Sequence, residues 1–282
     1  MAETPRKKKI VRAEPTAKTT DAGGGDSKPT WTASPEAKKS ALTLRLIALG
    51  LWLLAIGGEA FAIFVLLRQQ PVNLILLIAA IVVIGALAIG GSLLWKRANR
   101  LDPASRKDPV RFFVQNQLGA IIAIVAFLPL IVLVLTNKNM DGRQKAIAGS
   151  IGVVVAAAAV FFGADFSPPS VEQYSAETNI VQQLTGENVV YWTASGSVFH
   201  VCADVPDVNK ESADGQIFQG TVADAHAAGK DRLTLKWESE ARTCGYSQEQ
   251  IDAVKAGVAA SSSPAPAESG APDDAETATP AP

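Results

Sequence analysis

The stretch "AIAGSIGVVVAAAAVFFGADFSPPSVEQY", residues 146–174, decides the fold. Its first part, Ala146 to Ala164, has no charged side chain and is long enough to cross the ~30 Å hydrocarbon core of a bilayer as a helix. The prolines of "SPPS" then stop that helix. Ser170 and Gln173 are spaced as in a capping box, which predicts that a new helix begins there. The stretch therefore predicts a junction between a membrane region and a water-soluble domain.

Three more apolar segments precede this junction, at 42–67, 72–95 and 113–136, so the sequence predicts four transmembrane helices. The connections at 68–73 and 137–145 are short, and each therefore joins neighbouring spans into an antiparallel hairpin. The expected fold is a membrane α-helical, four-span bundle of two hairpins, followed by a small α+β domain. The expected parts are a disordered basic tail (1–40), the membrane region (41–165), the α+β domain (166–257) and a disordered acidic tail (258–282).

Charge predicts how the chain lies across the membrane. Residues 1–40 hold nine Lys/Arg against five Asp/Glu, and the loop 96–111 holds six Lys/Arg. The positive-inside rule therefore places the N-terminus and this loop on the cytoplasmic side of the plasma membrane. The first apolar segment starts too late, and is too long, for a signal peptide. The run "RKKK" at 6–9 is interpreted as part of a solvated tail, so no nucleic-acid partner is expected.

Glu59 is the one carboxylate well inside a predicted span, and an intramembrane acid is a functional candidate by default. It could serve a small transporter or channel component, or simply pair with a polar group of another span or with water. Small residues four apart, Ala86 with Gly90 and Gly119 with Ala123, allow close helix packing and leave homo-oligomerisation open.

The C-terminal domain reads as alternating short elements. A helix is predicted from Ser170 to Gly186, and a β-hairpin at 189–202 turns at Gly196. A strand at 216–221, a helix at 222–229, a strand at 232–237 and a helix at 247–257 follow. Its acidic side chains, including Glu238 and Glu240, are interpreted as a solvated surface.

His200 and Cys202 lie two residues apart on the predicted hairpin, in a chain with two histidines and two cysteines. Cys202 and Cys244 could form a disulfide, which would stabilise so small a domain by about 4 kcal/mol in the chain-entropy model. They could also remain thiols. A zinc site would need nearly all of His200, Cys202, His226 and Cys244, and no Cys-x-x-Cys spacing is present, so zinc is the weaker alternative and no cofactor is expected. His226 is interpreted as a surface residue.

The cysteines and the span count point to different compartments. Four spans return the C-terminal domain to the cytoplasm, where a disulfide would not persist. Bridged cysteines would instead indicate an extracellular domain, which requires that one apolar segment does not cross, and the third, interrupted by Pro129, is the weakest of the four. We expect the cytoplasmic arrangement, with the extracellular one as its alternative.

The segments "LPLIVLVLTNKNMDGRQKAI", "FSPPSVEQY", "VVYWTASGSVFHVC" and "GTVADAHAAGKDRLTLKWESEA" resemble uncharacterised multi-pass membrane proteins of actinobacteria. That resemblance implies no activity.

No pattern typical of a catalytic site is present. The favoured prediction is a non-enzymatic structural or interaction protein of the bacterial cell envelope, set in the lipid bilayer and bound to an unknown membrane or envelope protein. Tyr191, Trp192 and Trp237 are the candidate anchors, unless they form the core of the domain. A transporter using Glu59 is the first alternative, and a thiol or metal-binding module at His200 and Cys202 is the second.

Overall fold

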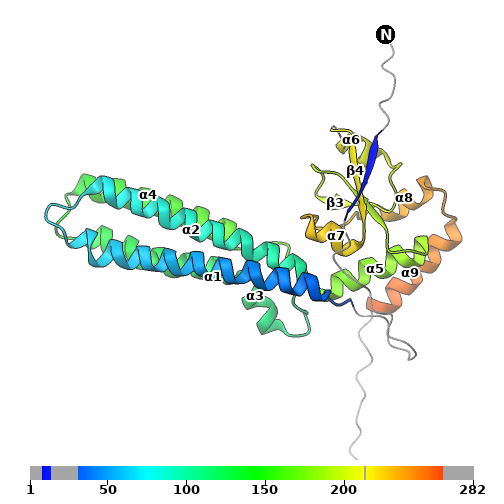
Figure 1. The fold of residues 1–282 in the computed structure, drawn as a ribbon, viewed down its shortest axis with the longest axis horizontal. Coiled ribbons are helices and arrows are strands. Elements are labelled where there is room, and N and C mark those ends of the chain that lie inside the picture. The colour runs from blue at the N-terminus through cyan, green and yellow to red at the C-terminus, as the bar shows by residue number, and fades with distance from the viewer. Residues whose placement is uncertain (1–7, 14–30, 213, 263–282) are drawn as a thin grey trace, which may run out of the picture.

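The computed structural model of the protein describes residues 8–13, 31–212 and 214–262. They form an elongated four-helix bundle with a small α+β domain at one end (Figure 1). The fold class predicted from the sequence is confirmed. The predicted tails are described only in part, and the rest of each tail lies outside the described residues.

Four helices of the described residues are long and apolar enough to cross a membrane, which confirms the four predicted spans. Three of them begin before the predicted apolar segment, because a polar side chain caps the first turn: Ser34, Asp108 and Asp141 each accept a hydrogen bond from a backbone N–H three residues later. The helices are α1 (Pro35–Phe64, continued by the 3₁₀ helix Leu66–Arg68), α2 (Leu74–Leu101), α3 (Pro109–Thr136) and α4 (Gly142–Gly163).

Small residues let the spans approach closely. A methyl group at Gly163 in α4 would lie 2.6 Å from the backbone nitrogen of Ala120 in α3. A methyl group at Gly119 would lie 2.7 Å from the hydroxyl oxygen of Ser92 in α2. Ala123 is fully buried in the bundle. The Gly119 and Ala123 pair therefore packs inside this chain.

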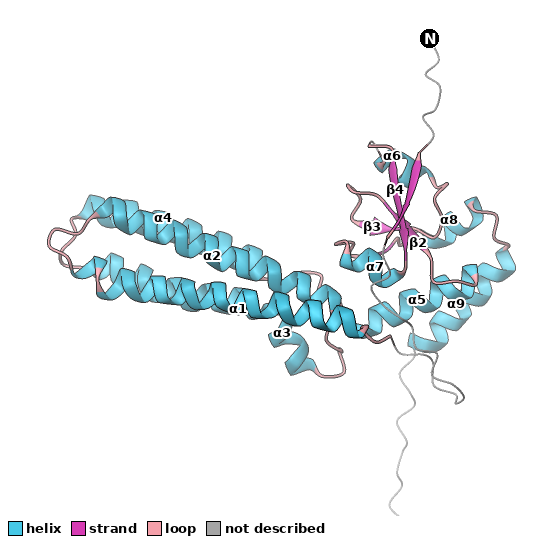
Figure 2. Cartoon of the chain, in the orientation of Figure 1, coloured by secondary structure: helices cyan, strands magenta, loops and turns pink. Residues whose placement is uncertain are grey.

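The C-terminal domain combines short strands with helices on its periphery (Figure 2). Its helices are α5 (Val171–Thr185), α6 (Pro206–Glu211), α7 (Val222–Ala227), α8 (Trp237–Thr243) and α9 (Gln248–Ser262). Its strands are β2 (Val190–Trp192), β3 (Val198–Phe199), β4 (Gln216–Gly220) and β5 (Arg232–Leu233). Predicted helix boundaries at Ser170, Gly186, Thr221 and Gly229 are confirmed, with Gly186 and Gly229 at positive φ.

The N-terminal tail contributes a strand to this domain. β1 (Lys9–Arg12) pairs in parallel with β4, and the sheet order is β1-β4-β2. Trp31 is also buried, against Tyr174 of α5. The prediction of disorder through residue 40 is therefore wrong for 8–13 and 31–40. The strand has only four residues, which is too short for a periodic pattern in the sequence, and it forms because β4 supplies its hydrogen-bond partners.

Other local predictions are wrong in a similar way. The predicted hairpin at 189–202 is reduced to one antiparallel bridge, between Tyr191 of β2 and His200, which follows β3. β2 and β3 belong to different sheets, because β2 pairs along its length with β4 and β3 pairs with β5. The predicted strand 232–237 ends after Leu233, and Trp237 opens α8. The acidic tail predicted from residue 258 begins as the last turns of α9, through Ser262.

The domain is docked on the end of α2 and on the loop that follows it. Arg100 forms an ion pair with Asp231 at 3.1 Å and donates to the Lys230 carbonyl. The Tyr174 hydroxyl donates to the Arg100 carbonyl oxygen at 2.9 Å. The Glu172 carboxylate accepts from Ser105 and from the Arg106 backbone. Burial alone raises the pKa of the Glu172 carboxyl, but these hydrogen bonds lower it overall.

Candidate functional site

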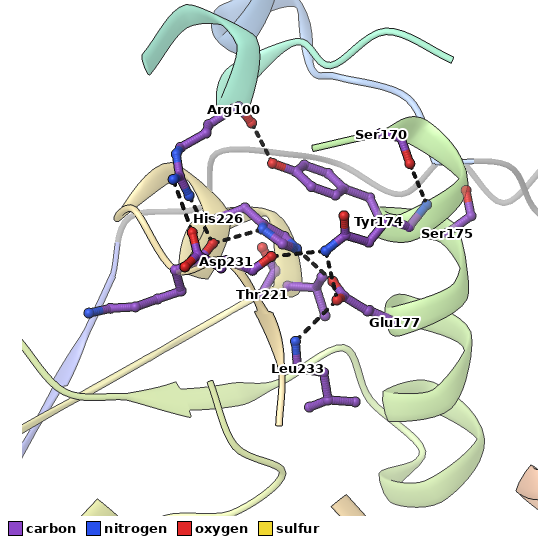
Figure 3. Close-up of polar contacts among 12 residues, drawn as sticks. Arg100, Ser170, Tyr174, Ser175, Glu177, Thr221, His226, Asp231 and Leu233 are labelled. Carbon is purple, nitrogen blue, oxygen red and sulfur yellow. Dashed lines mark hydrogen bonds and ion pairs between the residues drawn. The ribbon is translucent and has the colours of Figure 1, made fainter. Parts of the chain in front are cut away.

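The first candidate site is a buried polar network at this junction (Figure 3). Its centre is His226 of α7, whose side chain is fully buried. Nε2 lies 2.6 Å from Oε2 of Glu177 in α5, and Nδ1 lies 3.0 Å from the Lys230 carbonyl oxygen. A carbonyl oxygen can only accept, so Nδ1 donates to Lys230, and Nε2 faces the Glu177 carboxyl group. The prediction that His226 lies at the surface is wrong, because α7 turns it into the core.

The other oxygen of Glu177 is also satisfied. Oε1 accepts from the Leu233 backbone N–H at 3.1 Å and from the Gln173 amide at 3.1 Å. Tyr174 stacks on the His226 ring at 3.9 Å between centroids, and Phe199 meets that ring edge-on. Burial raises the pKa of the Tyr174 phenol well above its usual range. The network is thus a closed structural unit that joins α5, α7 and β5.

His200 forms the second histidine–carboxylate pair. Its Nδ1 lies 2.8 Å from Oε1 of Glu240 in α8, and both side chains are buried. Its Nε2 has no hydrogen-bond partner among the described residues and lies 4.0 Å from Oε2 of Glu211. Glu240 was predicted to be a surface acid, which is wrong, because the α8 helix points it into the core.

A buried lysine is hydrogen-bonded to the loop between β2 and β3. Lys230 donates to the carbonyl oxygens of Ala194 and Gly196, and its side chain is buried. Burial lowers the pKa of its ammonium, and the nearby Glu211 carboxylate acts in the opposite direction. These bonds fix the loop between β2 and β3. Among the described residues, no hydroxyl or thiol forms a hydrogen bond with Nε2 of His200.

Cys202 and Cys244 lie together, at disulfide-bonding distance, with their Cα atoms 6.5 Å apart. The pair joins the segment after β3 to the end of α8, across 42 residues of sequence.

The four residues considered for zinc are divided among three places: the cysteine pair, the Glu240 contact of His200 and the Glu177 contact of His226. Within the described ranges, no group of three or more His, Cys, Asp or Glu side chains is arranged to hold a metal ion.

The three candidate aromatic anchors have different positions. Trp192 is 3 % exposed and stacks on Phe218 in the core, so it is not a surface anchor. Tyr191 is half-buried beside Val205, Val208 and Ile217. Trp237 is half-buried at the start of α8. The latter two remain accessible enough to contact another molecule.

Glu59 of α1 is buried in the bundle, 6 % exposed, and the backbone of Leu130 in α3 lies at hydrogen-bonding distance of its carboxyl group. Its Oε1 has no hydrogen-bond partner in the described part of the chain. No Lys, Arg or His forms an ion pair with it there. The alternative predicted from the sequence was that Glu59 pairs with a polar group of another span. Among the described residues, no charged side chain takes that place.

A cavity of about 560 Å³ opens between the domain and the membrane end of the bundle. Its walls come from the loop before α3, from the segment after α4, from α5, and from β5 with the residues that follow it. Arg106, Arg232, Phe166, Leu235 and Trp237 line it.

Sequence reasoning missed most of these groups. Glu177, Lys230 and Glu240 are ordinary charged residues in sequence, and burial alone gives them their roles. For Glu177 a usable signal existed, since it shares a helix face with Tyr174 and Val181, which follows from spacings of three and four residues. For Glu240 and Lys230 no local pattern was available.

Comparisons with protein-family models, with curated proteins and with solved structures found no match for this chain. The resemblance to actinobacterial membrane proteins stays a prediction.

Proposed function

We propose that this chain is an integral membrane protein of the bacterial cell envelope that acts by binding a partner protein and not by catalysis. The observation that carries the proposal is the burial of the reactive groups of the domain. Each histidine lies in the core against a glutamate, and the two cysteines lie against each other. Side chains enclosed in this way shape a domain but cannot reach a substrate. Family membership among uncharacterised actinobacterial membrane proteins is part of the same proposal.

The binding surface in this proposal includes Tyr191 and Trp237. Half-buried aromatic side chains on a rigid scaffold are typical anchors of protein interfaces. The scaffold is rigid because the domain is joined to the spans through Arg100, Tyr174 and Glu172. Burial raises the pKa of the Tyr191 phenol, and the neighbouring Tyr246, Asp204 and Glu187 add to this effect. An uncharged phenol ringed by acids suits a partner with hydrogen-bond donors or positive charge.

We propose a cytoplasmic position for the domain. β1 pairs with β4, so the N-terminal segment and the domain lie on the same side of the membrane, together with the α2–α3 loop. The extracellular alternative would then translocate the nine basic residues of 1–40 and the six of 96–111, against the positive-inside rule. In the cytoplasm the cysteine pair would be held as thiols for most of the time.

Site-specific photo-cross-linking in native membranes tests the proposed function. A photo-reactive phenylalanine analogue replaces Tyr191 or Trp237 in the full chain, and Lys138 at the opposite end of the bundle is the control position. We expect a discrete cross-linked protein adduct from the domain positions and none from the control. Incorporation without any discrete protein adduct at Tyr191 and Trp237 would contradict the proposal.

Movement of protons or cations is a second candidate function, favoured by the unpartnered Oε1 of Glu59. A carboxyl group without a cationic partner inside a bundle is a place where a proton or cation can bind. The test is the ion flux of the reconstituted protein with Glu59 and with Glu59→Gln. Equal flux in the two proteins, or none in either, would remove this candidate.

A further inference from the structure

The cavity between the domain and the bundle lies at the membrane surface. Phe166 and Pro168 in its wall follow within a few residues of Gly163, where α4 ends, and Arg106 precedes α3, which begins at Pro109. The ribbon places this junction where the bundle meets the domain (Figure 1). A ligand in the cavity would therefore sit at the level of the lipid head groups.

The charges of the cavity favour an anion. Arg106 and Arg232 are exposed, and neither forms an ion pair in the described ranges. The two acids in the wall have partners of their own, since Glu177 lies against His226 and Asp231 pairs with Arg100. Among the described residues the two guanidinium groups thus have no carboxylate partner, and that of Arg106 lies 5.8 Å from the centroid of the Phe112 ring. Planar donors of this kind bind phosphate well.

The same cavity has apolar residues in its wall. Phe166 is 73 % exposed and Leu235 is 77 % exposed. The Phe166 ring lies 5.6 Å from that of Phe161, which in turn contacts Phe162 at the end of α4. Aromatic side chains gather at this depth in membrane proteins, where the ring contacts both head groups and acyl chains. A volume of about 560 Å³ lies in the usual range for small-ligand sites.

We propose that this cavity binds the phosphate head of one anionic phospholipid of the bilayer. Arg106 and Arg232 hold the phosphate, while Phe166 and Leu235 contact the start of the acyl chains. This lipid site goes beyond the function proposed above, which concerns a protein partner on the domain, and it does not depend on that partner.

Native mass spectrometry of the purified full chain tests the proposal. The protein is titrated with phosphatidylglycerol or with zwitterionic phosphatidylcholine, and an excess of sn-glycerol 3-phosphate separates a lipid site from a site for a soluble phosphate. We expect one phosphatidylglycerol retained in preference to phosphatidylcholine, and little competition from the soluble phosphate. Equal retention of the two lipids, or full competition by sn-glycerol 3-phosphate, would overturn the proposal.

Variants identify the residues. Arg106→Gln with Arg232→Gln should lower phosphatidylglycerol affinity about tenfold or more, since each basic residue near an anionic surface contributes severalfold. Arg106→Lys with Arg232→Lys keeps the charge and should retain part of the affinity. The matched control is Lys107→Gln with Arg111→Gln, which removes two exposed charges near the same loop but outside the cavity wall. An equal loss in this control would assign the binding to general surface charge and overturn the proposal.

Discussion

The bundle and the C-terminal domain bury very different side chains. Apart from Glu59, Ser92, Asn99 and Asn116, the buried residues of the spans are almost all alanine, glycine or larger apolar side chains. The domain, in contrast, buries two histidines, a lysine and several acids in fewer than a hundred residues. The difference follows from the solvent: spans in lipid associate through close packing of small residues, whereas a small domain in water needs specific polar pairs to fix its core.

The largest expected loss of stability comes from a variant that breaks a buried polar pair of the domain. Glu177→Ala removes the partner of His226 and leaves the Leu233 N–H without its acceptor. Loss of one member of a buried pair costs about 3–5 kcal/mol of unfolding free energy. Chemical unfolding of the purified full chain, followed by domain fluorescence, measures this change. Glu187→Ala, at an exposed acid two residues past the end of α5, is the control. A loss below about 1 kcal/mol would show that the network is not a stability element.

The next largest effect on stability is expected from the cysteine pair, and it should again be confined to the domain. A bridge across 42 residues stabilises by about 2–4 kcal/mol, because it restricts the unfolded chain. Reduction of the oxidised purified protein should therefore lower the melting temperature of the domain and leave the melting of the spans unchanged. Cys202→Ser with Cys244→Ser should make the domain insensitive to the reductant. Equal melting of the wild-type protein with and without reductant would contradict a stabilising bridge.

A third variant tests the packing of the bundle. Gly163→Ala places a methyl group against the backbone of Gly119 and Ala120, which cannot move aside as a side chain can. Overpacking of this kind costs about 1–3 kcal/mol. Gly57→Ala, where the added methyl meets open space, is the matched control and should be nearly neutral. Thermal stability in detergent distinguishes the two, and equal melting temperatures would argue against close α3–α4 contact.

The smallest expected effect concerns the connection between the two regions. The Arg100–Asp231 ion pair is partly exposed, with 24 % and 43 % of the side chains accessible. Such a pair contributes roughly 0.2–1 kcal/mol because solvent screens it. A double-mutant cycle with Arg100→Gln and Asp231→Asn measures the coupling energy. A coupling above about 2 kcal/mol would mean that this contact, and not the buried Tyr174, dominates the docking.

The sequence predicted the helices well and the strands poorly. The spans have long apolar patterns and α5 has boundary residues at Ser170 and Gly186, and such signals are local. Strands of two to five residues carry almost no periodicity, so the pairing of β1 with β4 and of β3 with β5 depends on contacts far apart in sequence. For the candidate sites, His200 and Cys202 stand out in the sequence because histidine and cysteine are rare in it, whereas Glu177, Glu240 and Lys230 resemble its many other charged residues.

The sequence by itself determined four membrane spans, their two hairpins, the basic loops and the presence of a small domain with two cysteines. These properties follow from composition, since apolar length and charge act on each segment separately. Only the tertiary structure decided that the N-terminal strand joins the domain sheet, that both histidines lie buried against glutamates, and that Arg106 and Arg232 line one cavity. Those arrangements need partners from segments far apart in the sequence. Whether a charged residue is buried or exposed is likewise decided only when the chain folds.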